Sequence, residues 1–357
     1  MKINEDLVLT KIEPNDIVNG KCVIPYGVKK IGYNVFVDNY ELEAIVIPPS
    51  VQEIDECAFF RCANLKNLVI PSSVTEIGNY AFCGCKNLTE VILHANLTSI
   101  KEGTFQSCTA LQDINFRGKV KKIEQYAFAG CTTLRNIKLP DELKEIYNSA
   151  FQCCESLKNI YIPNGVQEIG PSAFACCTSL KRMTLPDNLK IIHSHTFSEC
   201  ENLHTVNLPK NLTNINSFAF YQCSKLSSVI FPESVKDIDV GAFENCYNLK
   251  EISLPEKLDY IGEAAFENTS LSKVMIPASV DTIGASAFVN DYLTEVVVHS
   301  NLKYDTNCFY DSCRQGLITV IEDNAQSHSV YDEIINNPSS KLSEDIEISF
   351  SAEEIER

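Results

Sequence analysis

Apolar residues recur along this chain with a period of 23 residues. The clearest marker is a phenylalanine that returns every 23 residues up to Phe266 and then at spacings of 22 and 21. The series runs Phe36, Phe59, Phe82, Phe105, Phe128, Phe151, Phe174, Phe197, Phe220, Phe243, Phe266, Phe288 and Phe309. A unit this short cannot bury its own apolar face, so it must stack on its neighbours. The pattern therefore predicts one continuous solenoid of about 13 coils.

Each unit follows the pattern LxxIxIPxxVxxIxxxAFxxC, as in residues 65–85. Leu68 and Ile70 alternate with polar residues, which predicts a short strand that ends at the proline. These strands must pair in parallel and in register, because only that arrangement keeps every apolar column inside. Val74 and Ile77 predict a second short extended or turn segment. The Ala-Phe-x-x-Cys stretch predicts a single turn of 3₁₀-helix or α-helix on the outer side.

This pattern resembles the bacterial-surface-antigen-A-like leucine-rich repeat, which is also known from treponemal leucine-rich repeat proteins and from protozoan surface proteins. The match runs from about Ile24 to Phe309. The resemblance implies an α/β repeat solenoid, a leucine-rich-repeat horseshoe with a concave parallel β-sheet and short 3₁₀ or turn segments on the convex side. It also implies protein binding as the usual role, and the family contains adhesins of oral and gut bacteria.

Both ends of the chain depart from the repeat, as expected if the outermost coils need polar caps. The last residues are acidic and carry few apolar side chains, which predicts a flexible tail. The expected parts are an N-terminal cap at 1–20, the solenoid at 21–316, a C-terminal cap at 317–336 with a strand at 317–321 and a helix at 329–336, and the tail at 337–357.

Charge limits the class of partner. The chain has 47 acidic and 30 basic residues, and its net charge of −17 repels nucleic acid and anionic membrane surfaces. No stretch approaches the roughly 20 apolar residues that cross a bilayer. The first residues show no secretory signal, so we expect a protein that is cytoplasmic where it is made. We also expect the protein to be a monomer.

The glutamate-rich C-terminus, residues 351–357, looks like the export signal of effectors that intracellular bacteria deliver by type IVB secretion. One hypothesis is therefore an effector that acts in the cytosol of a host cell. The other interpretation is an ordinary solvated tail.

Nine of the 16 cysteines occupy one repeat position, three residues after the phenylalanine. They are Cys62, Cys85, Cys108, Cys131, Cys154, Cys177, Cys200, Cys223 and Cys246. We expect them to be reduced and buried as small hydrophobic residues, which fits a reducing compartment. His193 and His195 near Cys200 superficially suggest zinc, but their repeat positions do not require the three side chains to converge. We expect no catalytic residue, no metal and no cofactor.

Strand alternation predicts which residues face solvent on the concave sheet. In this acidic chain, basic and aromatic residues fall at outward positions on four consecutive strands, and tyrosine and arginine are frequent in binding hot spots. The predicted partner-binding residues are Arg117, Lys138, Tyr161, Arg182, Asn115, Asp113 and His94. An acidic or mixed loop of a protein partner is expected there, and the apolar strip Val23, Val46, Val69 and Ile92 is the next candidate surface.

The sequence thus predicts a non-enzymatic scaffold for protein–protein interaction. A cell-surface adhesin of the same repeat family is the first alternative. The second is an enzyme that uses the repeats as a substrate receptor and carries its activity in residues 310–357.

Overall fold

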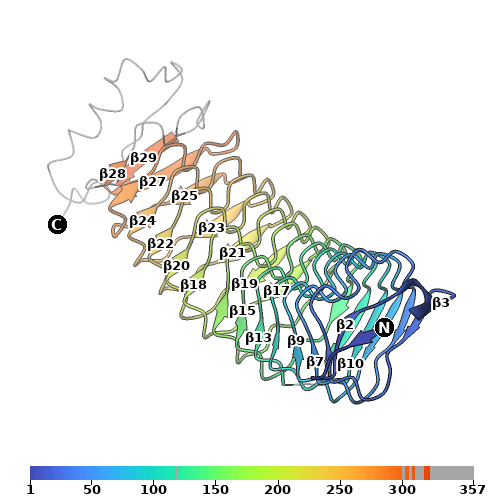
Figure 1. The fold of residues 1–357 in the computed structure, drawn as a ribbon. Helices are drawn as coiled ribbons and strands as arrows, with labels where there is room; N and C mark the ends of the chain where they lie inside the picture. The colour runs from blue at the N-terminus through green and yellow to red at the C-terminus, as the bar shows by residue number, and fades with distance from the viewer. Residues whose placement is uncertain (117–118, 300–301, 305–307, 310–316, 322–357) are drawn as a thin grey trace, which may run out of the picture. The chain divides into compact units, whose positions relative to one another are not determined.

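The computed structural model describes residues 1–116, 119–299, 302–304, 308–309 and 317–321. The chain divides into two compact units, Met1–Asn188 (unit 1) and Leu189–Arg357 (unit 2). Each unit is a stack of coils that contribute short strands to parallel sheets (Figure 1).

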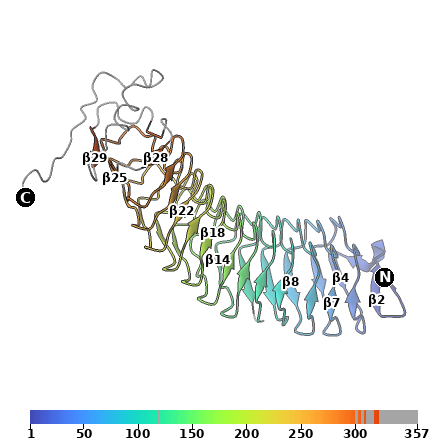
Figure 2. The same cartoon turned by 90° about the vertical axis from the view of Figure 1, so that its left-hand side faces the viewer.

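The first sheet of unit 1 is formed by the alternating half of each repeat. In β8 (Asn67–Ile70), Leu68 and Ile70 are buried while Asn67 and Val69 are exposed, so the predicted alternation is confirmed. The strands pair in parallel with a constant offset of one repeat, and Glu90 lies opposite both Asn67 and Asp113. Figure 2 shows β4 and β8 within this stack. The sheet contains β3 (Ile17–Val18), β4 (Lys21–Val23), β6 (Ala44–Val46), β8, β10 (Glu90–Leu93), β12 (Asp113–Phe116) and β14 (Asn136–Ile137).

The second half of each coil adds a two-residue strand that ends on the buried isoleucine. In β9 (Glu76–Ile77), Ile77 enters the core and Glu76 faces solvent, so the predicted second extended segment is confirmed. One sheet of unit 1 contains β1 (Lys2–Ile3), β2 (Val8–Lys11), β5 (Lys30–Ile31), β7 (Glu53–Ile54) and β9, and another contains β11 (Ser99–Ile100), β13 (Lys122–Ile123), β15 (Glu145–Ile146) and β16 (Glu168–Ile169). A further strand, β17 (Arg182–Thr184), follows in unit 1.

Unit 2 repeats this design. Its largest sheet contains β18 (Ile191–Ile192), β20 (Asn214–Ile215), β22 (Asp237–Ile238), β24 (Tyr260–Ile261), β26 (Thr282–Ile283) and β28 (Lys303–Tyr304). The strands from the alternating halves of its coils are β19 (Thr205–Asn207), β21 (Ser228–Ile230), β23 (Glu251–Ser253), β25 (Lys273–Met275), β27 (Glu295–His299) and β29 (Leu317–Ile321).

The third side of each coil, here called the turn side, is where the sequence predicted helix. The prediction is not confirmed, because the described residues contain no α-helix and their one 3₁₀ segment is η1 (Pro14–Asp16). The Ala-Phe-x-x-Cys stretch forms consecutive turns instead. Cys57 and Arg61, two residues before and after Phe59, have left-handed φ values of 54° and 57°, which interrupt a right-handed helix.

Hydrogen bonds between coils explain this conformation. The N–H groups of Cys57, Phe59 and Arg61 donate to carbonyls of the next coil at 2.7–3.0 Å, while the intervening N–H of Phe60 closes a turn onto Cys57. A left-handed residue other than glycine costs about 1 kcal/mol, and these bonds offset that cost. The turn side thus forms a third ladder of hydrogen bonds between coils. It forms no helix because its N–H groups donate alternately to a carbonyl of their own turn and to a carbonyl of the next coil.

One glycine on the turn side is required because a neighbouring tyrosine ring fills the space of a side chain, and not because of its φ angle. Gly103 has φ +57°, but Tyr126 and Ser149 adopt φ 56° and 53° at the same repeat position. A Cβ on Gly103 would lie 2.2 Å from the ring of Tyr80, which therefore occupies the space of that side chain.

The phenylalanine column forms the centre of the core, as predicted. The rings from Phe36 to Phe288 are almost fully buried. Adjacent rings stack nearly parallel in both units, with centroids 4.7 Å apart for Phe36 and Phe59 and 5.1 Å apart for Phe220 and Phe243. These distances suit offset stacking of aromatic rings.

The ends of the array also show how edge strands are arranged. In unit 1, β1 pairs antiparallel with β2, and β3 pairs antiparallel with β4, so the first coil is bordered by strands of the opposite direction. In unit 2, the predicted strand at 317–321 is present as β29 and pairs in parallel with β27. The helix predicted at 329–336 and the tail at 337–357 lie outside the described residues, and the horseshoe curvature and domain boundaries stay predictions.

Candidate functional site

The outer face of the first sheet in unit 1 presents three solvent-facing positions per coil: the first, second and fourth residues after the leading leucine. In one coil these are Arg135, Asn136 and Lys138, all exposed, while Leu134 and Ile137 are buried. Alternation along the strand places the second and fourth residues outward. The first residue also reaches solvent, because it lies where the chain enters the strand.

The structure places most of the predicted binding residues on this face. Asp113 and Asn115 are exposed on β12, and Lys138 is exposed just after β14. Tyr161 is 64% exposed, and Arg182 is exposed at the start of β17. These two residues continue the same outward positions into the next two coils of unit 1, beyond β14, and we count those coils as part of this face.

Two predicted residues differ from that description. His94 is half-buried after β10, and its backbone N–H donates to the Ile70 carbonyl at 3.0 Å. Arg117 lies outside the described residues.

Sequence reasoning missed the first outward position of the coils, and this position holds a column of cations. Arg135, Lys158 and Lys181 are spaced by 23 residues and all are exposed. The N–H of Lys181 donates to the Lys158 carbonyl at 3.2 Å, so these two residues are neighbours in the stack. The 23-residue spacing was the available signal, but strict alternation directs attention to the second and fourth positions.

Together these residues form a cationic strip, which we define as Arg135, Lys138, Lys158, Lys181 and Arg182. Tyr161 lies among them. The nine outward positions of these three coils hold five cations and no acidic residue, in a chain of net charge −17. At about 4.8 Å per coil, the strip extends roughly 10 Å along the stack.

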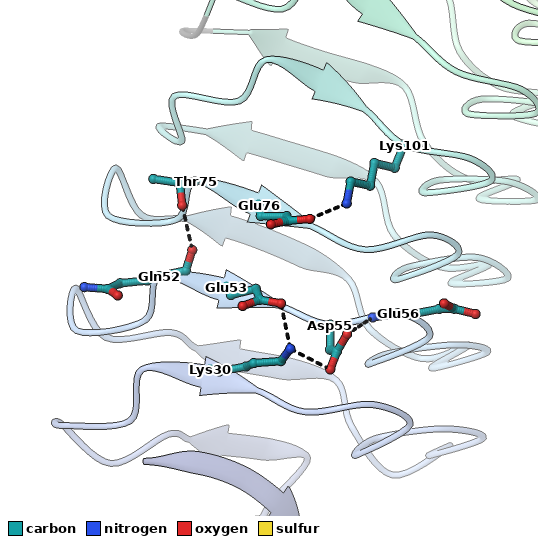
Figure 3. A network of polar contacts seen from close by, with 8 residues as sticks. All are labelled: Lys30, Gln52, Glu53, Asp55, Glu56, Thr75, Glu76 and Lys101. Atoms are coloured by element: carbon teal, nitrogen blue, oxygen red, sulfur yellow. Dashed lines mark hydrogen bonds and ion pairs between the residues drawn. The ribbon is translucent and has the colours of Figure 1, made fainter. Parts of the chain in front are cut away.

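The cations of the strip are not neutralised within the described residues of the chain, where none of the five forms an ion pair with a carboxylate. The second-sheet side of the same unit behaves differently. There Lys30 lies 2.6 Å from Glu53 and 2.9 Å from Asp55, and Lys101 pairs with Glu76 (Figure 3). These pairs connect side chains of neighbouring coils and leave little net charge on that face.

The strip therefore does not stabilise the fold. Exposed like charges a few ångströms apart repel by up to about 1 kcal/mol per adjacent pair in water. A surface that only needed to be soluble would interleave both signs, as the second-sheet face does. What remains is a positive, aromatic-containing face open to a ligand of negative charge.

These coils also match a known family. A model described as the BspA type Leucine rich repeat region (6 copies) matches residues 20–133, 104–224 and 213–334. These matches extend over most of the chain. The chain belongs to the BspA-type leucine-rich repeat family.

Solved structures of bacterial leucine-rich repeat proteins are similar to this BspA-type chain. A leucine-rich repeat protein from Bacteroides ovatus is 30% identical, with 77% of this chain and 62% of that chain covered and a TM-score of 0.52. The present chain thus spans 62% of that protein's length. A leucine-rich cell surface protein from Faecalibacterium prausnitzii is 26% identical, with 91% and 93% covered and a TM-score of 0.59.

The T. pallidum leucine-rich repeat protein is 32% identical over 57% of this chain and 75% of that chain, with a TM-score of 0.33. Among curated proteins, none matches this chain. Leucine-rich repeat proteins generally bind protein partners, and the comparisons indicate no enzyme family.

The column cysteines of this BspA-type protein are part of its core. The thiol of Cys85 donates to the carbonyl of Phe59 at 3.3 Å, and the thiol of Cys131 donates to that of Phe105 at 3.2 Å. Burial raises the pKa of Cys62 and of Cys131 to about 12. A thiol held protonated in this way is neither a nucleophile nor a metal ligand at neutral pH.

The histidine cluster of unit 2 does not gather into a metal site. The ring of His195 stacks on Phe218 with centroids 5.1 Å apart, and the carbonyl of His193 accepts the Thr196 hydroxyl at 2.7 Å. Across the described part of the chain, no group of three or more His, Cys, Asp or Glu side chains could hold a metal ion.

A shallow hollow of about 570 Å³ opens on the turn side of unit 1. It forms above Gly84, which lacks a side chain between Arg61 and Ser107, and Phe60 and Tyr80 line its sides. Cys83 also lines the hollow, but burial raises the pKa of its thiol to about 11. The lining therefore offers aromatic and cationic contacts and no activated nucleophile.

The described residues contain no helix that is long and apolar enough to cross a membrane.

Proposed function

We propose that this protein is a scaffold that binds a protein partner through the outer face of the first sheet of unit 1. The observation that carries the proposal is the cationic strip, whose five exposed cations have no intramolecular carboxylate partner in the described structure. Family membership supports it, because leucine-rich repeat proteins generally bind proteins. The strip would bind an acidic segment of the partner, and Tyr161 would supply a large rigid contact at its centre.

The proposal predicts that Tyr161→Ala combined with Arg182→Ala weakens binding of the partner by about 2 kcal/mol, roughly 30-fold in Kd. Both side chains are exposed, so the thermal midpoint should stay unchanged. The measurement is affinity capture with the full chain as bait, identification of the bound protein, and titration of that protein against both forms.

A matched control is Tyr26→Ala combined with Lys29→Ala, which also removes an exposed tyrosine and an exposed cation but from the turn beyond the first sheet. This control should bind the partner as the original chain does. Equal loss in both double variants, or loss in neither, would place the contact on another surface.

The place of action has two candidates. Similarity to the Faecalibacterium prausnitzii cell surface protein, which covers 91% of this chain, supports display on a cell surface as an adhesin. The acidic sequence at 351–357 supports the effector hypothesis, in which the chain acts inside a host cell. Both use the same binding face.

Two experiments distinguish surface display from delivery into a host cell. Surface display predicts that protease added to intact producing cells degrades the chain, whereas delivery predicts that a reporter fused to residues 337–357 enters host cells. Protection from protease together with no delivery would exclude both hypotheses and favour a cytoplasmic scaffold.

A further inference from the structure

The outward residue four positions after the start of each coil changes from apolar to polar or cationic along unit 1. In the N-terminal coils it is a row of β-branched side chains, with Val23 55%, Val46 42% and Val69 48% exposed. Ile92 continues the row on β10, opposite Val69. Val23 and Val46 are also directly opposite each other, so the four side chains form one contiguous apolar row. We call these four residues the valine row.

The valine row and the cationic strip lie on the same face. After Ile92, the same position holds Asn115 on the adjacent strand and then Lys138, where the strip begins. Valine suits a strand even when it is exposed, so the row alone would carry no conclusion. Its continuity with an unneutralised cationic surface is what makes the face bipartite.

We propose that the partner binds through a single bipartite segment, in which an apolar block covers the valine row and an acidic block covers the cationic strip. This inference rests on the proposed function and adds the chemistry and order of the partner's contacts. The apolar block would remove valine surface from water, and the carboxylates would pair with the strip.

The length of the face sets the length of that segment. From Val23 to Arg182 the face crosses eight coils, which at about 4.8 Å per coil gives a span of roughly 34 Å. An extended chain covers this in about 10 residues, and a helix in about 22. A single segment can therefore reach both halves, with the apolar block toward β4 and the acidic block toward β17.

A second copy of this chain fits the face poorly. Two copies stacked face to face in the same direction would place the strip on the strip, and in opposite directions would place it on the valine row. The first arrangement opposes cations to cations, and in the second a carboxylate beside the valine row, Glu43, already pairs with Lys66 of its own chain. A polyphosphate such as nucleic acid would satisfy the strip but leave the valine row uncovered, so an acidic and apolar polypeptide is the occupant that fits both halves.

The test is selection of random displayed peptides of about 16 residues on the full-length chain. We expect enriched peptides to contain an apolar block and an acidic block, separated and in a constant order. A synthetic peptide of the enriched sequence should bind at least tenfold more tightly than a scrambled peptide of identical composition. Its affinity should fall as NaCl rises from about 50 to 500 mM, because the strip is exposed.

Two variants separate the halves. Lys158→Glu with Lys181→Glu lowers the net charge of the five-residue strip from +5 to +1. Val46→Thr with Val69→Thr keeps the shape and strand propensity of the row but makes it polar. Each should weaken the selected peptide about tenfold or more. The control Ile230→Thr changes a side chain that is 86% exposed in unit 2 and should have no effect.

The outcomes distinguish this inference from the function on which it rests. If the lysine variant weakens binding and the valine variant does not, the bipartite inference is wrong and the proposed binding face stands. If peptides bind both variants as tightly as they bind the original chain, neither stands. An equally tight scrambled peptide would also overturn the inference, since order would then be irrelevant.

Discussion

A buried cysteine suits its repeat position because its thiol donates a second hydrogen bond to a carbonyl that already accepts one backbone N–H. The carbonyl of Phe59 accepts the N–H of Cys62 at 3.1 Å within its own turn and the thiol of Cys85 at 3.3 Å from the next coil. Alanine would leave the second bond unmade. The weak S–H donor of a small, apolar side chain makes this bond inside the core.

This role predicts that neighbouring cysteines differ strongly in their rate of alkylation. Cys154 is buried, its thiol donates to the Phe128 carbonyl at 3.3 Å, and burial raises its pKa well above the usual value. Cys153 is only half-buried on the turn side. In the native protein at pH 8, we expect iodoacetamide to modify Cys153 about a hundredfold faster than Cys154, because Cys154 must wait for local opening. Peptide mapping by mass spectrometry measures both rates.

The same reaction in denaturant is the control, and there the two residues should react at similar rates. Equal rates in the native protein would show that the column thiols are accessible.

At the scale of the element, the turn-side ladder brings equivalent residues of neighbouring coils into contact. This alignment favours stacked phenylalanines but also opposes like charges. Glu244 and Glu267 follow column phenylalanines one repeat apart in unit 2, and both are half-buried. Burial and the facing Glu267 carboxylate raise the pKa of Glu244. Burial and the charge of Glu263 raise that of Glu267.

The sign of this shift gives a prediction for Glu244→Gln. A carboxyl whose pKa is higher in the folded than in the unfolded chain destabilises the fold above that pKa, and the penalty disappears as the pH falls and the group is protonated. The variant should therefore raise the thermal midpoint at pH 7.5, by about 1 °C, and lose this advantage near pH 4. Differential scanning calorimetry across that range makes the measurement.

Glu256→Gln provides the comparison, since Glu256 is an exposed glutamate of the same unit. A gain from Glu244→Gln that persists unchanged at pH 4, or a loss at pH 7.5, would contradict the electrostatic explanation.

At the scale of the whole molecule, the predicted repeat logic holds in each unit. The register of the strands follows from the 23-residue period, because each coil must place its leucine, isoleucine and phenylalanine beside those of its neighbours. The helix expected around Phe82 was the exception. Propensity and spacing permit a helical turn there, but the N–H groups of Tyr80, Phe82 and Gly84 donate to the next coil instead. A local pattern does not reveal a bond to a residue 20 or more positions away.

The binding face was predicted in part for a similar reason. Lys138, Tyr161 and Arg182 were found from strict alternation and are exposed in the structure. Alternation gave no reason to consider Arg135, Lys158 and Lys181, because the first residue of a coil is not yet in a strand. Its exposure depends on the path by which the chain enters the sheet.

The sequence by itself determined the order of the coils, their parallel register and the identity of the core, since these follow from the recurrence of apolar residues alone. Only the tertiary structure decided how the turn side is hydrogen-bonded and which cations lack a carboxylate. Those properties depend on which atoms of neighbouring coils meet, and the 23-residue period brings those coils together without specifying their contacts.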